Sequence, residues 1–211
     1  MDSRASKAQT PAPPDREPVM RFEPHRLGKF WDEINVGDRM IDFPDHTVTI
    51  TAEMVEEFAR LTGDLNPLHV DHEFAGRSVY RRIIAHGAFL TSLAIGQYHR
   101  CDYTYGTILA LSTLYTRFLQ PAYVGDSLYI EMHVVGKSES TNPKRGMATY
   151  KAWMRRASDH EAIIRLDFDL MVLRLAGRRG LARLGVTDEV LANRRFRSNT
   201  DPPPPPNLTY P

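Results

Sequence analysis

The chain has 211 residues, a formal net charge of +1 at pH 7, 42% hydrophobic residues and 25% charged residues. This length suits one domain of about 150 residues with extensions, and the near-neutral charge gives no general attraction to nucleic acid or to a membrane. The single cysteine, Cys101, excludes an internal disulfide, and no apolar run approaches the roughly 20 residues that span a membrane. Since Met1 to Pro18 also lacks the apolar core of a secretory signal, we expect a cytoplasmic protein with a small-molecule partner.

The composition divides the chain into three parts. Residues 1–27 mix alanine, proline, serine and charge without periodicity, which predicts a flexible N-terminal arm. Residues 28–176 carry the regular patterns of a folded domain. Residues 177–211 form a C-terminal extension with a linker at 177–180, a short capped helix within 187–195 and a proline-rich tail that cannot join a sheet.

The first regular elements of the domain are a short strand and a helix. Residues 46–51 alternate at period two, which predicts a strand, and 53–61 have the apolar spacing of an amphipathic helix. Thr51 is placed to cap that helix, and Gly63 to end it in the left-handed conformation. One face of the helix carries its apolar side chains: Met54, Val55, Phe58 and Leu61.

A polar turn follows this helix and reads Gly63-Asp64-Leu65-Asn66-Pro67-Leu68-His69. Pro67 forces Asn66 into an extended conformation and turns the chain, so the side chains of Asp64 and His69 can return to one cavity. We expect them on the order of 3 to 6 Å apart, close enough to share a water. Asn66 either contacts the reacting centre or only fixes the turn, and the sequence leaves both open.

The string His69, Asp71, His72 contains metal-ligand residue types, but we expect no metal there. The proline turn already accounts for His69. Asp71 fits the N-cap of a short helix that starts at His72.

The pattern of the remaining residues of the domain predicts one helix and a sheet, which together make an α+β fold. Residues 87–98 are apolar on several sides, as expected of a helix enclosed by a sheet. Four strand-like runs follow, separated by turns: 107–118, 127–137, 146–156 and 161–175. A long curled antiparallel sheet around one buried helix is the simplest packing, and there is no internal repeat.

The pattern from Phe58 to Ala75, aromatic-x-x-Leu-Thr-Gly-Asp-x-Asn-Pro-Leu-His with alanine six residues later, closely resembles the signature of the MaoC-like hydratases. Residues 84–90, Ile-Ala-His-Gly-Ala-Phe-Leu, resemble the entry to the central helix of that family. Residues 114–121, with Gly125-Asp126, resemble its next strand and turn. The resemblance covers residues 28 to 175, except that the family often carries glycine where this chain reads Ser78-Val79-Tyr80-Arg81-Arg82.

This resemblance implies a single hot-dog fold and a defined reaction. The family reversibly hydrates trans-2-enoyl-CoA to (R)-3-hydroxyacyl-CoA, without a metal or redox cofactor, and acts as a homodimer whose sheets join edge to edge. Asp64 and His69 would hold the water between them, with Asp64 as base and His69 as acid as the first assignment for hydration. Asn66 belongs to the same signature and is counted with this pair among the candidate catalytic residues. The Gly87 amide, at a helix N-terminus, would polarise the thioester carbonyl.

Four further residues are assigned to substrate binding. The His86 side chain is expected to form hydrogen bonds beside the reacting groups and not to act as a catalyst. Ser92 lies on the helix that Gly87 begins, where core packing is the simpler alternative. Arg81 and Arg82 lie in a basic loop that suits the phosphates of coenzyme A, although a solvated surface explains them equally well.

Two alternatives remain open at the level of sequence. One is another hot-dog enzyme, either an acyl-carrier-protein dehydratase or a thioesterase. The other is a non-catalytic protein that binds acyl thioesters and recruits partners through its proline-rich and basic tails.

Overall fold

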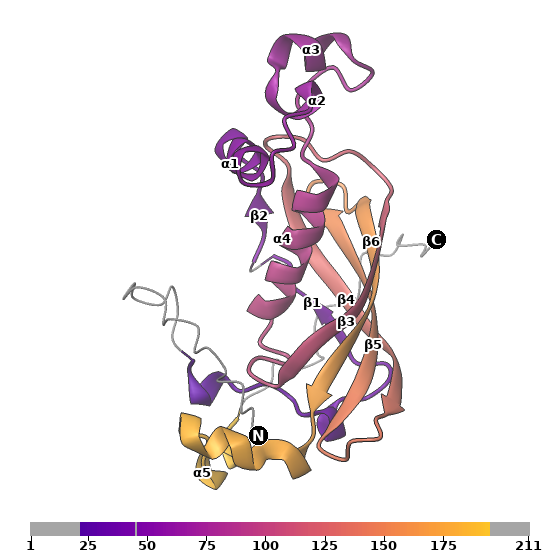
Figure 1. The fold of residues 1–211 in the computed structure, drawn as a ribbon. Coiled ribbons are helices and arrows are strands. Elements are labelled where there is room, and N and C mark those ends of the chain that lie inside the picture. The colour runs from indigo at the N-terminus through magenta and orange to yellow at the C-terminus, as the bar shows by residue number, and fades with distance from the viewer. Residues whose placement is uncertain (1–21, 45, 195–211) are drawn as a thin grey trace, which may run out of the picture.

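The computed structural model describes residues 22–44 and 46–194. An antiparallel sheet of six strands, in the order β1-β4-β5-β6-β3 with β2 also paired to β4, forms its centre (Figure 1). The strands are β1 (Arg39–Ile41), β2 (Val48–Thr49), β3 (Ile108–Phe118), β4 (Ser127–Glu139), β5 (Arg145–Arg156) and β6 (Ala162–Leu173). Because β3 pairs with β6 alone, it is an edge strand of the sheet.

One long helix lies along the inner side of the curled sheet, and shorter helices lie at both ends (Figure 1). The α-helices are α1 (Ala52–Thr62), α2 (Pro67–Val70), α3 (His72–Arg77), α4 (Gly87–Arg100) and α5 (Asp188–Ala192), and the 3-10 helices are η1 (Pro24–Arg26), η2 (Trp31–Glu33) and η3 (Leu175–Leu184). The central helix is α4, while α1, α2 and α3 gather at one end of the molecule and α5 at the other.

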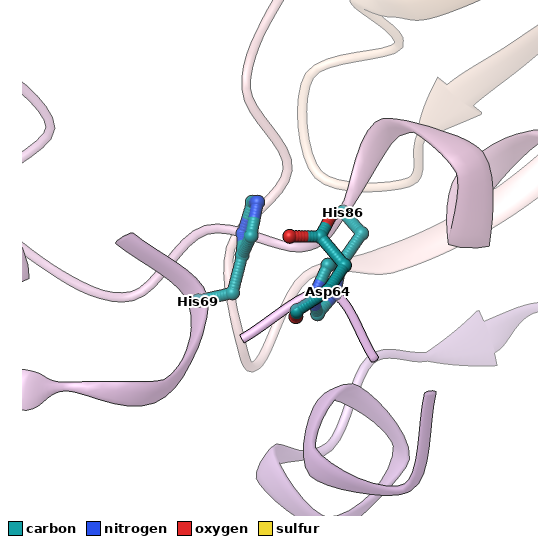
Figure 2. Close-up of side chains that lie close together, drawn as sticks. All are labelled: Asp64, His69 and His86. Carbon is teal, nitrogen blue, oxygen red and sulfur yellow. The ribbon is translucent and has the colours of Figure 1, made fainter. Parts of the chain in front are cut away.

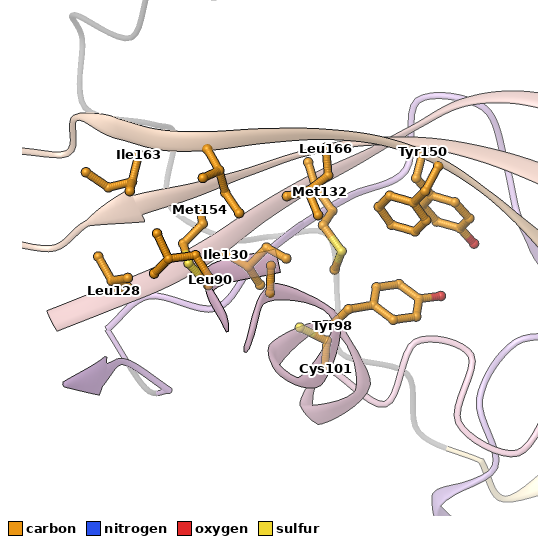
Figure 3. Packing of buried hydrophobic residues seen from close by; sticks show 14 of the residues in the cluster. Leu90, Tyr98, Cys101, Leu128, Ile130, Met132, Tyr150, Met154, Ile163 and Leu166 are labelled. Carbon is orange, nitrogen blue, oxygen red and sulfur yellow. The ribbon is translucent and has the colours of Figure 1, made fainter. Parts of the chain in front are cut away.

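The core fills the space between α4 and the sheet (Figure 3). On β5, small and large residues alternate along the buried face: Ala148, Tyr150, Ala152 and Met154. The predicted alternation on β6 is also present, with Leu166 and Phe168 buried and Asp167 between them only partly buried. Leu90 and Tyr98 of α4 pack against these strands. The expected antiparallel sheet around one helix is therefore confirmed.

The strands differ from the sequence expectation only at the N-terminal side. The predicted strand over 46–51 is reduced to the two residues of β2, and β1 was not predicted at all. Only one residue of β1, Met40, is buried, so three residues carry too short a pattern to be recognised.

The ends of α1 and α3 are formed as predicted. The Thr51 hydroxyl accepts the N–H of Met54 at 3.2 Å, and Gly63 ends α1 at φ 77°. The Asp71 carboxylate caps α3. The predicted apolar face of α1 was wrong at Leu61, which is 83% exposed, because the helix turns Val55 and Ala59 toward the core instead.

Segments from both ends of the described chain form a second, smaller core. Its buried members are Leu27, Phe30 and Val186, and the side chains packed against them are Phe22, Leu173, Leu175, Leu181 and Leu191. Arg194 fixes this cluster, since its guanidinium donates to the Gly28 carbonyl at 2.9 Å and pairs with Glu33 at 2.6 Å.

This small core differs from two expectations. Residues 22–27, assigned to a flexible arm, contribute buried side chains, and the linker expected at 177–180 lies within η3. The apolar residues there are too irregularly spaced to show a period. The rest of the expected arm, residues 1–21, and the proline-rich tail lie outside the described residues.

Within the part of the chain that the structure describes, no helix has the length and apolar character needed to cross a membrane. The cytoplasmic location stays a prediction.

Candidate active site

The turn between α1 and α2 brings the predicted acid/base pair together. An oxygen of the Asp64 carboxylate accepts the N–H of Asn66 at 3.4 Å. The Asn66 side chain in turn caps α2 by accepting the N–H of Leu68 at 3.1 Å, with Pro67 in the first turn of that helix. These consecutive hydrogen bonds turn the chain back toward Asp64. His69 lies one helical turn beyond Asn66.

Three side chains converge at this turn (Figure 2). One side-chain oxygen or nitrogen from each of Asp64, His69 and His86 lies within 4.8 Å of the other two. Asp64 follows α1, His69 lies on α2 and His86 precedes α4. The expected separation of the Asp64 and His69 groups is confirmed, and His86 is a third member of the cluster.

A hydrogen bond to the main chain fixes the tautomer of His69. Its Nδ1 lies 2.7 Å from the Ile84 carbonyl oxygen. Because a carbonyl oxygen can only accept, Nδ1 carries the hydrogen. The Nε2 atom is therefore the one that can gain or lose a proton toward a bound molecule.

His86 is buried beside this pair and supports it. Its Nε2 donates to the main-chain carbonyl of Asp64 at 3.0 Å, and its ring stacks on that of His69 with 3.8 Å between centroids. Phe58 covers the ring from the side of α1. Burial lowers the pKa of His86 and the neighbouring His69 lowers it further, while the bond to the Asp64 carbonyl opposes the shift. His86 is thus held neutral, and its expected contact with substrate stays a prediction.

The same three residues are of types that bind metals, and their geometry bears on that possibility. The lone pair of an imidazole nitrogen lies in the plane of its ring, but the rings of His69 and His86 are stacked with only 30° between their planes. A tetrahedral metal site requires the lone pairs of its ligands to point to one position, and those of His69 and His86 do not. The arrangement suits proton transfer better than metal binding.

Gly87 begins α4 directly beside this cluster. The N–H groups of the first turn have no partner within a helix, so the Gly87 amide is available to a ligand oxygen. A Cβ at this position would lie 2.7 Å from the ring of Phe118. A side chain at this position would displace the ring of Phe118, so glycine permits the close approach of Phe118 to α4, and the two residues together form one wall of the site.

A cavity of about 430 Å³ opens at this place. It is lined by His69, Tyr80, Ile84, Ala85, Gly87, Leu90, Phe118, Leu119, Gln120, Pro121 and Ala122. Its volume lies within the range of small-molecule sites, and its lining combines apolar walls with a few polar groups, as such sites do. The cavity joins the His69 imidazole to the Gly87 amide.

The other predicted site residues do not line this cavity, and Asp64 and His86 are among them. Arg81 and Arg82 follow Tyr80 in the chain, and both are exposed. The Arg82 guanidinium stacks over the Tyr123 ring, 3.8 Å from the ring centroid. Ser92 is exposed and donates to the Ala88 carbonyl. Asn66 fixes the turn as described above. The contacts of these residues with substrate stay predictions.

Sequence reasoning missed two of the side chains that shape the cavity. Tyr80 belongs to a segment where the chain departs from the expected family pattern, and Phe118 lies on an edge strand with little periodicity. The only available signal was the position of Phe118 three residues before Pro121, within a segment that resembles the family.

Comparison with known proteins identifies the family of this chain. A model of the MaoC like domain family matches residues 38–154, more than half of the chain. The chain therefore belongs to this hydratase/dehydratase family.

Three relatives are similar to parts of the chain. An (R)-specific enoyl-CoA hydratase from Aeromonas caviae is 36% identical over 88 residues, which are 42% of this chain and 64% of that protein. The peroxisomal enoyl-CoA hydratase 2 of Arabidopsis thaliana is 39% identical over 77 residues, 36% of this chain and 25% of that protein. A 3-hydroxybutyryl-CoA dehydratase from Methylorubrum extorquens is 26% identical over 153 residues, 67% of this chain and 96% of that protein. This chain thus matches less than two thirds of the length of the first two.

Solved structures show the same fold. A monoamine oxidase regulatory protein from Archaeoglobus superposes with a TM-score of 0.64 at 25% identity, covering 71% of this chain and 97% of that one. The (R)-hydratase from A. caviae gives a TM-score of 0.52 at 26% identity, covering 67% and 97%. A protein from Mycobacterium tuberculosis with a double hot-dog fold gives 0.60 at 21% identity, covering 70% and 44%. The fold of this chain is a hot dog.

Proposed function

We propose that this protein interconverts trans-2-enoyl-CoA and (R)-3-hydroxyacyl-CoA. The observation that carries the proposal is the convergence of the Asp64 carboxylate and the His69 imidazole beside a cavity that also reaches the Gly87 amide. Membership of the family and the similarity to an (R)-specific enoyl-CoA hydratase support this choice of reaction.

In the proposed hydration, one water lies between Asp64 and His69. His69 enters this step with hydrogens on both ring nitrogens. The Asp64 carboxylate takes a proton from the water as the water oxygen adds to the β-carbon, and Nε2–H of His69 delivers a proton to the α-carbon, which leaves His69 neutral with its hydrogen on Nδ1. Nδ1–H stays with the Ile84 carbonyl throughout, which keeps Nε2 aimed at the reacting atoms. The two groups then exchange a proton through solvent, which restores the starting state.

The thioester oxygen gains negative charge in this step. We place that oxygen against the Gly87 N–H, where the first turn of α4 offers a positive dipole end. A single donor of this kind contributes about 3 kcal/mol of transition-state stabilisation. Arg81 and Arg82, exposed near the cavity, are the proposed contacts for the phosphates of coenzyme A.

We also propose that the active form is a homodimer joined through β3. This edge strand exposes a set of apolar side chains that no part of the described chain covers: Leu109, Leu111, Leu114, Tyr115 and Phe118. A long apolar edge with unpaired main-chain groups favours pairing with another strand. Phe118 lies both on this strand and in the cavity wall, which would place each site close to the dimer contact.

The decisive experiment compares matched substitutions. Asp64→Asn and His69→Asn should each lower kcat for crotonyl-CoA hydration by at least ~100-fold, and the double variant should be little worse than the worse single one. Asp71→Asn and His72→Asn are the controls, because they change the same residue types seven residues after Asp64 and three residues after His69 but lie outside the cluster. Chiral analysis of the product should give the (R) alcohol.

Binding and thiol-release assays separate the alternatives. CoA esters should still bind the inactive variants, since most contacts come from the rest of the substrate. Release of free thiol from wild-type protein would instead indicate a thioesterase. Binding of CoA esters without turnover across a panel of chain lengths would indicate a non-catalytic protein, and undiminished turnover in both single variants would place the chemistry elsewhere.

A further inference from the structure

Arg156, the last residue of β5, joins two loops with one side chain. Its Nε lies 3.2 Å from the Asp126 carboxylate, one terminal nitrogen lies 2.7 Å from the Asp159 carboxylate, and the other donates to the Pro121 carbonyl at 3.2 Å. The side chain is four-fifths buried. The planar guanidinium presents several N–H groups in fixed directions, so it can hold three partners at once, which a lysine ammonium on a flexible stem does poorly.

The loop that Arg156 holds, residues 119–126, is one wall of the cavity. Asp126 binds the loop a second time, because its carboxylate accepts the N–H of Tyr123 at 3.0 Å. Pro121 and Ala122, between these anchors, line the cavity. The loop is therefore anchored at Pro121 by Arg156 and at Tyr123 by Asp126.

The same loop also contacts residues 84 and 85, which directly precede His86 and Gly87. The Ala122 carbonyl accepts the N–H of Ala85 at 2.8 Å, and Tyr123 forms an isolated bridge with Ile84. The Ile84 carbonyl is the acceptor that fixes the His69 tautomer. His86 and Gly87 follow directly in the sequence. Arg156 is therefore linked to the site through two hydrogen bonds, its own to the Pro121 carbonyl and that between Ala85 and Ala122. The atoms at the far end of this link, the Ile84 carbonyl and the Gly87 amide, would orient the acid/base pair and the thioester.

We propose that Arg156 is a positioning residue for this site, which fixes the 119–126 loop and through it the Ile84 carbonyl and the Gly87 amide, without touching substrate. The inference rests on the proposed function. Arg156 itself lies just past residues 38–154, the segment that the family model matches. The inference also gives a role to Pro121 and to the Gly125-Asp126 turn, which the sequence singled out without a function.

Electrostatics keep this contact charged. Burial lowers the pKa of the Arg156 guanidinium, but hydrogen bonds and charge attraction from Asp159 and Asp126 outweigh it, and the net pKa is raised. The guanidinium therefore stays protonated in this contact.

The test compares Arg156→Met and Arg156→Lys with Arg165→Met. Arg165 is a matched control, since it is paired with Asp167 at 2.9 Å and similarly buried, but contacts no loop of the site. Arg156→Met should lower kcat ~30- to 100-fold with little change in KM, and Arg156→Lys should recover part of the loss. Arg165→Met should keep wild-type kcat. If Arg156→Met does not fold, Arg156→Lys decides the matter: reduced kcat at unchanged thermal stability supports the role, and wild-type kcat overturns it.

A second readout does not depend on turnover. Nitrogen NMR of labelled histidine should show His69 with its hydrogen on Nδ1 in the wild type and in Arg165→Met, and a mixture of tautomers in Arg156→Met and Arg156→Lys. Unchanged His69 signals in the Arg156 variants would overturn the inference. If wild-type protein hydrates no thioester, the proposed function fails, while the His69 signals still decide the role of Arg156.

Discussion

At the scale of single residues, the two stacked imidazoles of the site carry their hydrogens on opposite nitrogens. His69 donates from Nδ1 to the Ile84 carbonyl, and His86 donates from Nε2 to the Asp64 carbonyl. Each ring is thus fixed by a main-chain acceptor from another segment. The open nitrogen of His69 borders the cavity, whereas the Nδ1 of His86 is buried and has no hydrogen-bond partner among the described residues. In the proposed mechanism the same residue type therefore transfers a proton in one case and supports the site in the other.

The neutral state of His86 predicts a pH-dependent stability. Its pKa is lowered from 6.5 by burial, so the unfolded chain binds a proton more readily than the folded one. The stabilising contribution is complete above the unfolded pKa and is lost as the pH falls below it. Thermal unfolding of the wild type should therefore weaken between about pH 7 and about pH 5, where carboxylates stay ionised. His86→Gln should show a smaller loss.

The exposed His72 provides the control for this measurement. His72→Gln should keep the wild-type pH dependence, while His99, whose pKa burial also lowers, accounts for part of the loss that remains in His86→Gln. An equal pH dependence in wild type and His86→Gln would contradict the buried neutral state.

At the scale of elements, a buried carboxylate joins three strands. Glu131 on β4 pairs with Arg39 on β1 and with Arg155 on β5, both at 2.8 Å, and its own strand contributes His133 at 3.0 Å. Burial alone would raise the pKa of Glu131, but the bonds from His133, Arg155 and Arg39 lower it to about 2. This stabilisation is complete above the ordinary pKa of 4.5 and is lost as the pH falls through about 2.

Glu131→Gln should destabilise the fold, because it leaves two arginines beside a neutral group. Breaking a buried pair in this way costs about 3 to 5 kcal/mol, measured as the free energy of unfolding in urea. Asp167→Asn, which breaks the less buried pair with Arg165, should cost under about 1 kcal/mol. Equal losses in both variants would show that Glu131 has no special role in joining β1 to the sheet.

The exposed edge of β3 leads to a prediction about assembly. Leu111→Lys should weaken the proposed dimer at least ~10-fold, because pairing would bury a charge in each copy. Val36→Lys is the control, since Val36 is an exposed apolar residue outside the strands. Light scattering during gel filtration gives the mass of each variant over a dilution series. A wild-type monomer at all concentrations, or a Leu111→Lys dimer as tight as the wild type, would exclude this interface.

At the scale of the whole molecule, the small core formed by both ends predicts two different effects of truncation. Removal of residues 198–211 should leave thermal stability and hydration activity nearly intact, as the sequence composition suggests. Removal of residues 185–211 also takes away Val186, Leu191 and Arg194, which costs about 3 kcal/mol or roughly 6 to 12 °C in melting temperature.

The site lies at the other end of the molecule, so kcat well below the melting temperature should be the same for both truncated proteins. A loss of activity at equal stability would show that the extension reaches the site.

The sequence was sufficient to predict an element wherever a motif coincides with a regular spacing of apolar residues. The caps of α1, the enclosed helix α4, the four long strands and the closeness of Asp64 to His69 could all be predicted, because each depends on neighbours within about twenty residues. Contacts between distant segments left no local pattern. The Ile84 carbonyl that orients His69, the ring of Phe118 against Gly87 and the packing of Leu27 on Val186 depend on how the sheet curls, and only the folded chain shows them.

The meeting of the two ends in one small core has a practical consequence. Phe22 and Leu191 pack on the same cluster, at the end of the molecule away from α2 and α3 (Figure 1). An attachment introduced at residue 22 or residue 194 can therefore tether the protein to a resin or a sensor surface with the cavity facing solution. For the same reason, a short linker between residues 22 and 194 could close the chain into a ring, with new termini opened at an exposed turn such as 140–143.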